Sequence, residues 1–397
     1  MQKKIIALAI ASALTAPAAF AADANDVTLY GVIDAAVRST SNINAAGSSY
    51  NGFSQGLFNG SRFGIKGSES IDGGIKAIYK LEAGFTLGTG ATDQQGQLFG
   101  REAWVGLKDS TMGTLTLGRQ YGNFSDAIGT GDVFGERHGN LVYSANNGNT
   151  SAPNQGDSVA ENGFMYQEMG YRYDNSILYA NQINSIKFGL MHSFSGQTTT
   201  APNNSGNTAS MNAVSAGYVS DAINFTAGYQ IEGDQTGKKH KNAGFGANYM
   251  YGEKNGVYAL YFQSKYDAGF TRIGLGTNST FGGTQAQARK DNIYSLSANY
   301  YATSNINLIG ALYHDSATNL IAAGDSGARN GVLATADYYF SKRTDAYLMA
   351  AHTAFSGALI GNPNGGNGVT VGGAAFAVAP GASGSVNTVM LGLRHRF

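Results

Sequence analysis

Hydrophobic and polar residues alternate with a period of two along most of this chain. In the closing stretch VMLGLRHRF, residues 389–397, every odd-numbered position except His395 is apolar, whereas Arg394 and Arg396 share the even-numbered face. Because successive side chains of a strand point to opposite sides, this stretch predicts a strand with one apolar and one basic face. Such a strand needs hydrocarbon on one side and water on the other.

The same alternation occurs in pairs of runs about short turns rich in Asp, Ser, Asn, Gly and Lys, which predicts seven antiparallel hairpins. They lie in the stretches FGIKGSESIDGGIKAIYKLEAGF, WVGLKDSTMGTLTLG, SILYANQINSIKFGL, GYVSDAINFTAGY, NYMYGEKNGVYALY, ANYYATSNINLIGAL and DYYFSKRTDAYLMA. The opening run VTLYGVIDAAV, residues 27–37, and the closing strand bring the expected total to sixteen strands. No stretch has a convincing helical period, so we expect an all-β chain.

Longer polar segments separate the hairpins at 39–60, 121–170, 270–290 and 356–385. Short turns at one rim, long loops at the other and aromatic residues near the run ends are typical of outer-membrane barrels, although aromatic residues also simply favour strands. In hydrocarbon an unpaired backbone group costs several kcal/mol, so the first and last strands must pair. A closed sheet of this size leaves an aqueous channel, since side chains fill only barrels of about eight strands.

Residues 1–21 have the features of a secretory signal, because two lysines precede an apolar stretch at 5–14, and Ala19 and Ala21 fit a signal peptidase site. Beyond this leader, 24 basic side chains stand against 26 acidic ones, a formal charge of −2. This balance gives no electrostatic basis for binding nucleic acid. The chain has no cysteine, and past the leader it has no apolar run of about 18 residues that would predict a membrane-spanning helix.

The stretches VTLYGVIDAAV, SRFGIKGSES, GIKAIYKLEAGF, FGREAWVGLKD, GTLTLGRQYGNFSDAIG, YRYDNSILY, FSKRTDAY and LGLRHRF follow one another along the chain. Together they resemble the general porins of Gram-negative outer membranes, most closely their betaproteobacterial branch. The resemblance implies one domain over residues 22–397, a sixteen-stranded antiparallel transmembrane β-barrel. It also implies a long third loop, at about 120–170, that folds into the lumen and narrows the channel.

The resemblance further implies a homotrimer in the outer membrane, reached through the periplasm. Its role would be passive diffusion of ions and small hydrophilic solutes, without catalytic residues, metal or cofactor. The last strand, ending in Phe397, would be recognised by the barrel-assembly machinery. Outer-membrane lipids and lipopolysaccharide would surround the protein.

A constriction would place a basic wall opposite acidic groups of the third loop, and the transverse field between them would orient polar solutes. By resemblance, the basic wall includes the arginines Arg62, Arg101, Arg119 and Arg172. Parity adds Lys76 and Lys80, and each of these cations could instead pair with a neighbouring carboxylate. The excess of basic over acidic groups predicts a weak preference for anions.

The acidic candidates on the third loop are Asp126, Asp132 and Glu136. Loops of the family often carry Pro-Glu-Phe-Gly-Gly, whereas this chain has Asp-Val-Phe-Gly-Glu at 132–136. The acidic group is therefore displaced or replaced, and the sequence leaves open which carboxylate lines the constriction.

Two other classes of protein compete with a channel. A barrel-borne outer-membrane hydrolase needs a Ser/His or Asp/His constellation on a smaller barrel, and a surface adhesin needs hydrophobic cores on both sheet faces. The stretch GDSGA at 324–328 and the segment around His352 resemble trypsin-like protease motifs, but their order is wrong and the disulfides of that family are impossible here. The six histidines show no metal-binding spacing.

Overall fold

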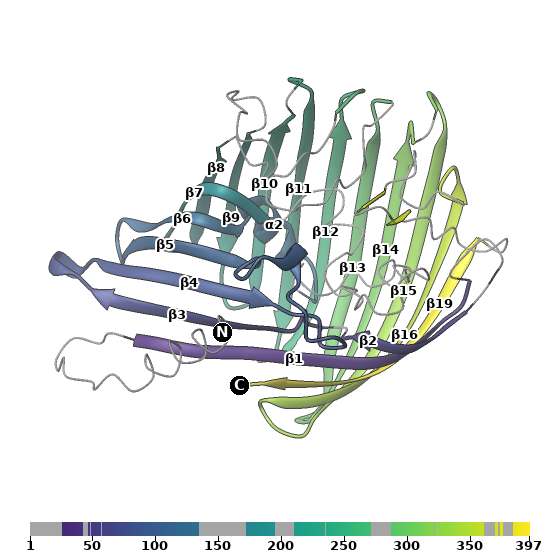
Figure 1. Cartoon of the computed structure of the whole chain (residues 1–397), viewed down its shortest axis with the longest axis horizontal. Helices are drawn as coiled ribbons and strands as arrows, with labels where there is room; N and C mark the ends of the chain where they lie inside the picture. Colours follow the sequence, from purple (N-terminus) through teal and green to yellow (C-terminus); the bar gives the residue numbers. More distant parts are fainter. Residues whose placement is uncertain are drawn as a thin grey trace, which may run out of the picture.

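The computed structural model describes most of residues 26–397 outside the longest loops (Figure 1). The described residues are 26–42, 47, 49–56, 58–134, 172–194, 210–234, 236–270, 287–320, 322–360, 370–371, 374–375 and 384–397. The expected signal at 1–21 lies outside these residues. No helix in the described part combines the length and apolar character needed to cross a bilayer.

Seventeen strands form one antiparallel sheet that closes on itself. Their bounds are β1 Asp26–Thr40, β2 Tyr50–Gln55, β3 Arg62–Ser70, β4 Lys76–Gly84, β5 Glu102–Asp109, β6 Gly113–Tyr121, β7 Arg172–Ile183, β8 Ile186–Ser193, β9 Met211–Val219, β10 Ile223–Gly233, β11 Lys239–Tyr251, β12 Asn255–Tyr266, β13 Lys290–Thr303, β14 Ile306–Thr318, β15 Ser326–Tyr339, β16 Thr344–Gly357 and β19 Ser385–Arg396. The short strands β17 Thr370–Val371 and β18 Ala374–Ala375 pair with each other. All seven predicted hairpins are present.

The strands β2 and β3 share one position in the barrel. Residues 35–40 of β1 pair with β2, and residues 26–32 of β1 pair with β3. The seventeen strands therefore occupy sixteen positions, which confirms the expected sixteen-stranded barrel. The segment 39–60 was expected to be a loop, but β2 forms within it because the far half of β1 would otherwise be an unpaired edge.

The barrel closes where β19 pairs with β1, from Val32 opposite Arg396 to Thr40 opposite Thr388. One residue further, Gly31 and Phe397 exchange two backbone hydrogen bonds, each 3.1 Å long between N and O. The last residue thus completes the ladder, as the pattern of the closing strand predicted. The start of β1 and the end of the chain lie at the rim that carries the short turns (Figure 1).

The two faces of the sheet have different chemistry. Along β19, Leu391 and Leu393 point outward and are exposed, whereas Met390 and Arg394 point inward and are buried. The same outward exposure of large apolar side chains occurs around the barrel, at Val105, Leu117, Leu190, Leu296, Leu312 and Leu348 among others. A continuous apolar exterior is the surface that a membrane-spanning barrel presents to lipid.

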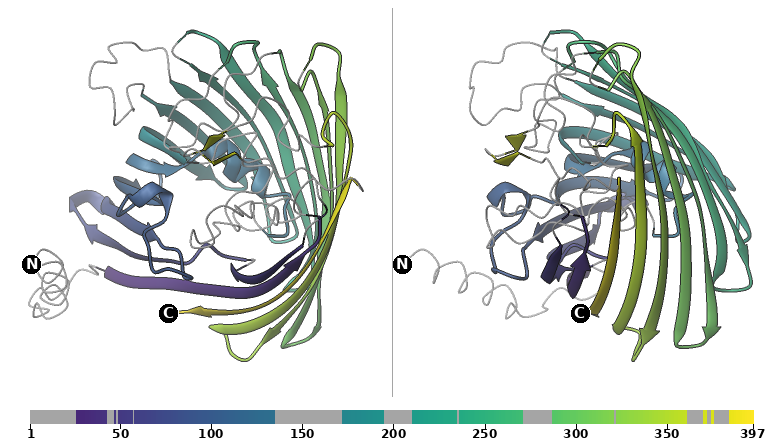
Figure 2. Two further views of the ribbon diagram at one scale, coloured as in Figure 1. Left: turned by 45° about the vertical axis from the view of Figure 1, so that its right-hand side comes forward. Right: turned by 90° about the vertical axis from the view of Figure 1, so that its right-hand side faces the viewer.

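The chain leaves the wall after β6 and enters the barrel. The helix α2, Asn123–Gly129, packs against the inner faces of β8 to β12 inside the barrel (Figure 2). Its side chains Phe124 and Ile128 are fully buried. Beyond it, Asn248 Nδ2 on β11 donates to the carbonyl oxygen of Thr130 at 2.8 Å. Residues 122–134 of the third loop therefore line the inner wall, and residues 135–171 lie outside the described part.

We predict that Gly31→Val weakens the closing seam. A Cβ at Gly31 would collide with the ring of Phe397 and would lie 2.8 Å from the carbonyl oxygen of Arg62. Overpacking of this kind costs about 1–3 kcal/mol, so the refolded variant should lose free energy of unfolding in urea. Gly310→Val on β14 is the control, because no heavy atom lies within 4 Å of a Cβ added there. Equal stability of the two variants would contradict this seam.

Candidate functional site

A cluster of basic side chains lies on the inner wall formed by β3, β4 and the start of β5. The Glu82 carboxylate stands at its centre and accepts a hydrogen bond from Arg101 Nε at 2.7 Å. Arg62 Nε lies 3.9 Å and Lys80 Nζ lies 3.4 Å from the same carboxylate. One carboxylate thus holds three cations together. The antiparallel pairing of β3 with β4 brings basic side chains of the two strands close to one another, since Arg62 lies opposite Gly84 and Lys66 lies opposite Lys80.

The hydroxyl group of Tyr121, the last residue of β6, connects a fourth cation to this cluster. Its oxygen accepts hydrogen bonds from Arg101 Nη2 at 2.9 Å and from Arg172 Nη2 at 2.7 Å. The Arg172 guanidinium also lies 4.8 Å from the centre of the Tyr121 ring. Charge-assisted hydrogen bonds and the cation–π contact compensate two guanidinium groups for the loss of water.

A second carboxylate, Glu102, accepts a hydrogen bond from Lys80 Nζ at 2.6 Å and another from Trp104 Nε1 at 2.8 Å. Tyr30 on β1 donates its hydroxyl proton to Glu82 at 2.7 Å. The Nζ atoms of Lys66 and Lys80 lie 5.4 Å and 5.7 Å from the centre of the Tyr30 ring. The ring therefore stabilises two lysines that face each other across the β3–β4 pair.

Charge is not balanced among the described residues of this cluster. Within the described ranges, Arg62, Lys80, Arg101 and Arg172 carry four positive charges against the two negative charges of Glu82 and Glu102, which leaves a net charge of +2. Arg101 and Arg172 are only 1% and 2% exposed, whereas 16% of the Arg62 side chain and 20% of the Lys80 side chain are exposed. The buried arginines add to the positive electrostatic potential of the cluster. The partly exposed side chains of Arg62 and Lys80 carry this positive charge to the surface of the lumen.

The structure does not bring Lys76 and Arg119 into this cluster. Lys76 begins β4 at the short-turn rim, opposite Lys108, and lies four residues, about 13 Å along the strand, from Lys80. Arg119 lies opposite Ala103, on the outward side of the sheet, and donates to Asp174 Oδ1 at 2.5 Å and to the Gly100 carbonyl oxygen at 2.6 Å. A bulge at Gly118 precedes Arg119, and Asp174 neutralises its charge.

The two acidic candidates of the third loop that the structure describes lie on other walls. Asp126 is exposed on α2 and lines a cavity of about 420 Å³ that it shares with Lys187 of β8. Asp132 is buried, and its Oδ1 accepts from the Phe134 backbone N–H at 3.3 Å and lies 3.5 Å from the hydroxyl oxygen of Tyr313 on β14. Glu136 lies outside the described residues.

The tip of the described loop segment is anchored at the barrel seam. The ring of Phe134 lies 5.8 Å from that of Phe58, and Phe58 packs edge-on against Tyr347 with ring centres 4.8 Å apart. The Asp34 carboxylate accepts from the Phe58 backbone N–H at 3.0 Å and from the Tyr347 hydroxyl at 2.8 Å. The Val133 backbone N–H also donates to Ser297 Oγ at 3.2 Å. These contacts hold residues 132–134 against the wall.

A serine, a histidine and a glutamate form a chain of hydrogen bonds near the long-loop rim. His240 contacts Glu232 Oε2 at 3.2 Å through Nδ1 and Ser264 Oγ at 2.7 Å through Nε2. The order resembles that of a hydrolase triad, but the three residues are at most 1% exposed, and the imidazole stacks on Tyr266 at 4.0 Å. No substrate carbonyl reaches a hydroxyl buried to this extent, so the network joins β10, β11 and β12.

Sequence reasoning did not assign to the site four side chains of the cluster, namely Tyr30, Glu82, Glu102 and Tyr121, or the adjacent Lys66. The alternation of side chains could have identified Tyr30 and Lys66 as inward-facing, because both alternate with outward apolar neighbours along their strands. No local pattern marks Tyr121, because its two arginine donors come from segments 20 and 51 residues away.

Comparisons with known proteins agree with this architecture. The family model of Gram-negative porins matches residues 7–358. An outer membrane porin protein of Bordetella pertussis is 35% identical over 201 residues, 47% of this chain and 47% of that protein. The major outer membrane protein P.IB of Neisseria meningitidis serogroup B is 33% identical over 136 residues, 34% of this chain and 37% of that protein. The chain therefore spans about half or less of these curated relatives.

Several solved structures are similar over nearly the whole chain. One of them is described as an anion-selective porin from Comamonas acidovorans, and it matches with a TM-score of 0.65 at 20% identity. The match covers 94% of this chain and 100% of that structure. At this identity the likeness establishes the fold of the barrel.

We predict that Tyr121→Phe destabilises the protein, because the ring remains while Arg101 and Arg172 lose a shared acceptor. Each hydrogen bond to a charged group contributes about 1.5–3 kcal/mol, so the midpoint of urea unfolding should fall clearly. Tyr229→Phe on the outward face of β10 is the matched control and should leave the midpoint unchanged. A Tyr121→Phe midpoint equal to that of the control would show that the hydroxyl does not organise the cluster.

Proposed function

Because the chain belongs to the family of Gram-negative porins, we propose that it forms a water-filled outer-membrane channel for passive diffusion of ions and small hydrophilic solutes. The observation that carries this proposal is the closed sheet of sixteen strand positions with charged and polar side chains on its inner face. Barrels of this size enclose an aqueous passage. In this proposal residues 1–21 direct export through the periplasm.

We propose a weak preference for anions, and the net charge of +2 in the cluster around Glu82 supports it. Two unit charges 4 Å apart interact by about 1 kcal/mol in water and about 4 kcal/mol at an effective dielectric constant near 20. The interaction energy of a partly hydrated ion that passes Arg62 and Lys80 lies between these two limits. An interaction energy in this range biases permeation without trapping the ion.

The acidic side of the transverse field is assigned to Asp126 in this proposal. Asp126 is the exposed carboxylate of the described loop segment, whereas Asp132 is buried against Tyr313 and serves as an anchor. Lys187 lies on the wall beside Asp126, so the field on that side is weaker than on the side of the arginines. This asymmetry also favours anions.

The channel acts as a homotrimer and does no covalent chemistry in this proposal. Burial of the Ser264, His240 and Glu232 side chains argues against a hydrolase. The charged inner face argues against an adhesin, which would need apolar packing on both faces of its sheets. The assembly machinery would recognise the strand that ends in Phe397, which already forms the closing ladder with β1.

Reversal potentials in a salt gradient across a planar bilayer test the proposal. We expect single-channel steps and a weakly anion-selective potential for the wild-type protein. The double variant Arg62→Gln, Lys80→Gln should shift the potential toward cations, because it removes two of the four positive charges and brings the cluster from +2 to zero. Arg101 still pairs with Glu82 in this variant, so the barrel should fold.

The matched control is the double variant Lys254→Gln, Lys342→Gln, which removes two exposed lysines from the short turns. It should retain the wild-type potential. A protein that folds but forms no pore would refute the channel. A cation-selective wild type, or equal shifts in the two double variants, would refute the assignment of selectivity to the cluster.

A further inference from the structure

The cavity of about 420 Å³ that Asp126 lines lies inside the barrel, between helix α2 and the inner faces of β5 to β10. Its edge includes the turn between β5 and β6, which belongs to the rim that carries the short turns. The cavity therefore lies on the short-turn side of the third loop. Its uncharged polar lining includes Thr114, Asn123, Gln182, Ser215 and Thr226.

A row of opposed residues on four adjacent strands explains why the wall is hollow here. Lys108 of β5 lies opposite Thr114 of β6, and the row continues through Ala180 of β7 to Gly189 of β8. The two strands at the end of the row carry the smallest side chains, which leaves room beneath α2. The helix covers that end, because a Cβ added at Gly189 would lie 3.2 Å from Asn123 Nδ2. Three strand spacings, about 14 Å, separate the ends of the row.

The two ends of this cavity present opposite charges. At the β5 end Lys108 is exposed, and within the described ranges no ion pair engages it. Lys76 lies opposite Lys108 on β4 and adds a second positive charge beside that end. At the α2 end the exposed carboxylate of Asp126 lines the cavity.

The two other charged side chains of the lining interact with their own surroundings. The Asp109 carboxylate accepts hydrogen bonds from the backbone N–H groups of Thr111 and Met112, both at 2.7 Å, and so stabilises its own turn. Lys187 Nζ lies 3.5 Å from Thr130 Oγ1, next to the end of α2. The lining thus contains two lysines and two aspartates and has no net charge. Such a lining favours a solute that is neutral overall but carries two separated charges.

The amide group of Asn123 adds a hydrogen-bond acceptor at the α2 end. Asn123 is buried, and its Nδ2 lies 3.4 Å from Ser215 Oγ and 3.5 Å from the carbonyl oxygen of Ala213. Its Oδ1 has no hydrogen-bond partner among the described residues. A buried acceptor without a donor is unfavourable, and the last torsion of an asparagine rotates easily. An ammonium group beside Asp126 would supply the donor.

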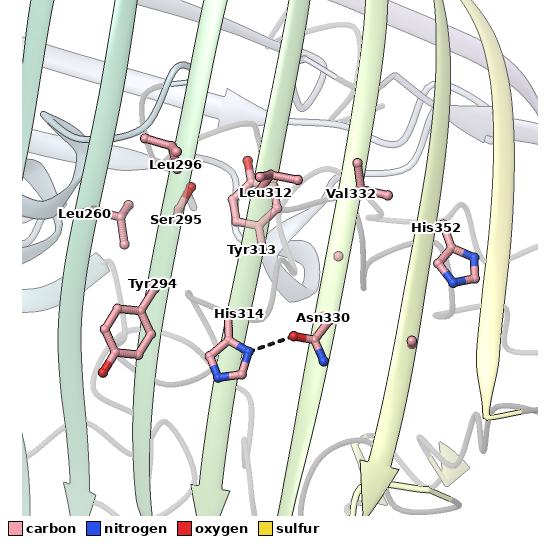
Figure 3. Close-up of a pocket in the computed structure, with 12 residues that line it drawn as sticks. Leu260, Tyr294, Ser295, Leu296, Leu312, Tyr313, His314, Asn330, Val332 and His352 are labelled. Carbon is pink, nitrogen blue, oxygen red and sulfur yellow. Dashed lines mark hydrogen bonds between the residues drawn. The ribbon is translucent and has the colours of Figure 1, made fainter.

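The outer face of the barrel has a hollow of similar size but different chemistry. It measures about 510 Å³ and lies between β13 and β16 (Figure 3). Leu296, Leu312 and Val332 line it, and no lysine, arginine, aspartate or glutamate does so. Of these two hollows, the inner cavity is therefore the one that suits a charged solute.

We propose that the inner cavity binds a small zwitterionic solute of the amino-acid class as it passes through the channel. Lys108 donates hydrogen bonds to the carboxylate of the solute, and Asp126 accepts hydrogen bonds from its ammonium group. Hydroxyl and amide groups of the wall surround the chain between the two charges. Water shares the cavity with the solute, so binding is weak enough for release, as conduction requires. The inference rests on the proposed channel function and names one class of its solutes.

Saturation-transfer NMR of the purified protein in detergent micelles measures this binding without requiring a pore. The probe is 4-aminobutyrate, which carries its ammonium group and its carboxylate at opposite ends of the chain. N-acetyl-4-aminobutyrate keeps only the carboxylate, and 4-aminobutanamide keeps only the ammonium group. We expect the wild type to bind the probe about tenfold more tightly than either derivative, because each derivative lacks one charge-assisted contact.

Single substitutions assign the two ends of the solute. Lys108→Gln should weaken binding of 4-aminobutyrate about tenfold and leave the affinity for 4-aminobutanamide unchanged, because that derivative has no carboxylate. Asp126→Asn should weaken binding of the probe to a similar extent and leave the affinity for the N-acetyl derivative unchanged. Lys254→Gln, in another short turn, is the matched control and should bind like the wild type.

A neutral pair of variants tests the cavity itself. Ala180→Leu fills its middle and should abolish binding of the probe and both derivatives. Ala216→Leu makes the same enlargement at an exposed position on the outer face of β9 and should retain wild-type binding. Retained binding in Ala180→Leu would overturn the site.

Equal affinities of Lys108→Gln and Lys254→Gln for 4-aminobutyrate would also overturn the site, as would equal affinities of the wild type for the probe and its two derivatives. Planar-bilayer recordings separate this inference from the proposed channel. A protein that forms pores but does not bind the probe overturns the solute site alone. A protein that forms no pore overturns the channel, and the role of the site in permeation with it.

Discussion

Pairing of every backbone N–H and C=O group is the constraint on which this structure depends. In hydrocarbon no water compensates an unpaired group, so a spanning sheet must have no edge. The ladder from Val32–Arg396 to Thr40–Thr388, extended by the mutual hydrogen bonds of Gly31 and Phe397, meets that condition. The same constraint explains β2, which pairs with the half of β1 that β3 does not reach.

Closure also fixes what the interior can contain. A ring of sixteen strand positions is too wide for wall side chains alone to fill, and the chain uses the remaining space for the third loop. Residues 122–134 cover the wall from β8 to the seam, while four cations gather around Glu82 and Tyr121 on the other side. The interior therefore combines a passage with a fixed electric field, and both follow from the closed sheet.

Much of the fold was predictable because a strand between lipid and water must alternate, and that pattern is local. The hairpins and the closing strand were therefore found, and inward parity added Lys80, which the structure places with Arg62 at the Glu82 carboxylate. The site was less predictable because it depends on contacts between distant segments. The bulge at Gly118 and the outward pairing of Arg119 with Asp174 have no signature in the sequence, and neither has the burial of Asp132 beside Tyr313.

The central claim is that one face of each strand contacts water inside a closed barrel and the other contacts lipid. Single cysteines placed at successive positions of β4, from Lys76 to Leu81, test it directly, because the chain has no cysteine of its own. In lipid vesicles a membrane-impermeant thiol reagent should modify cysteines at positions 76, 78 and 80 and spare those at 77, 79 and 81. Uniform labelling, or labelling of the opposite set, would contradict the account.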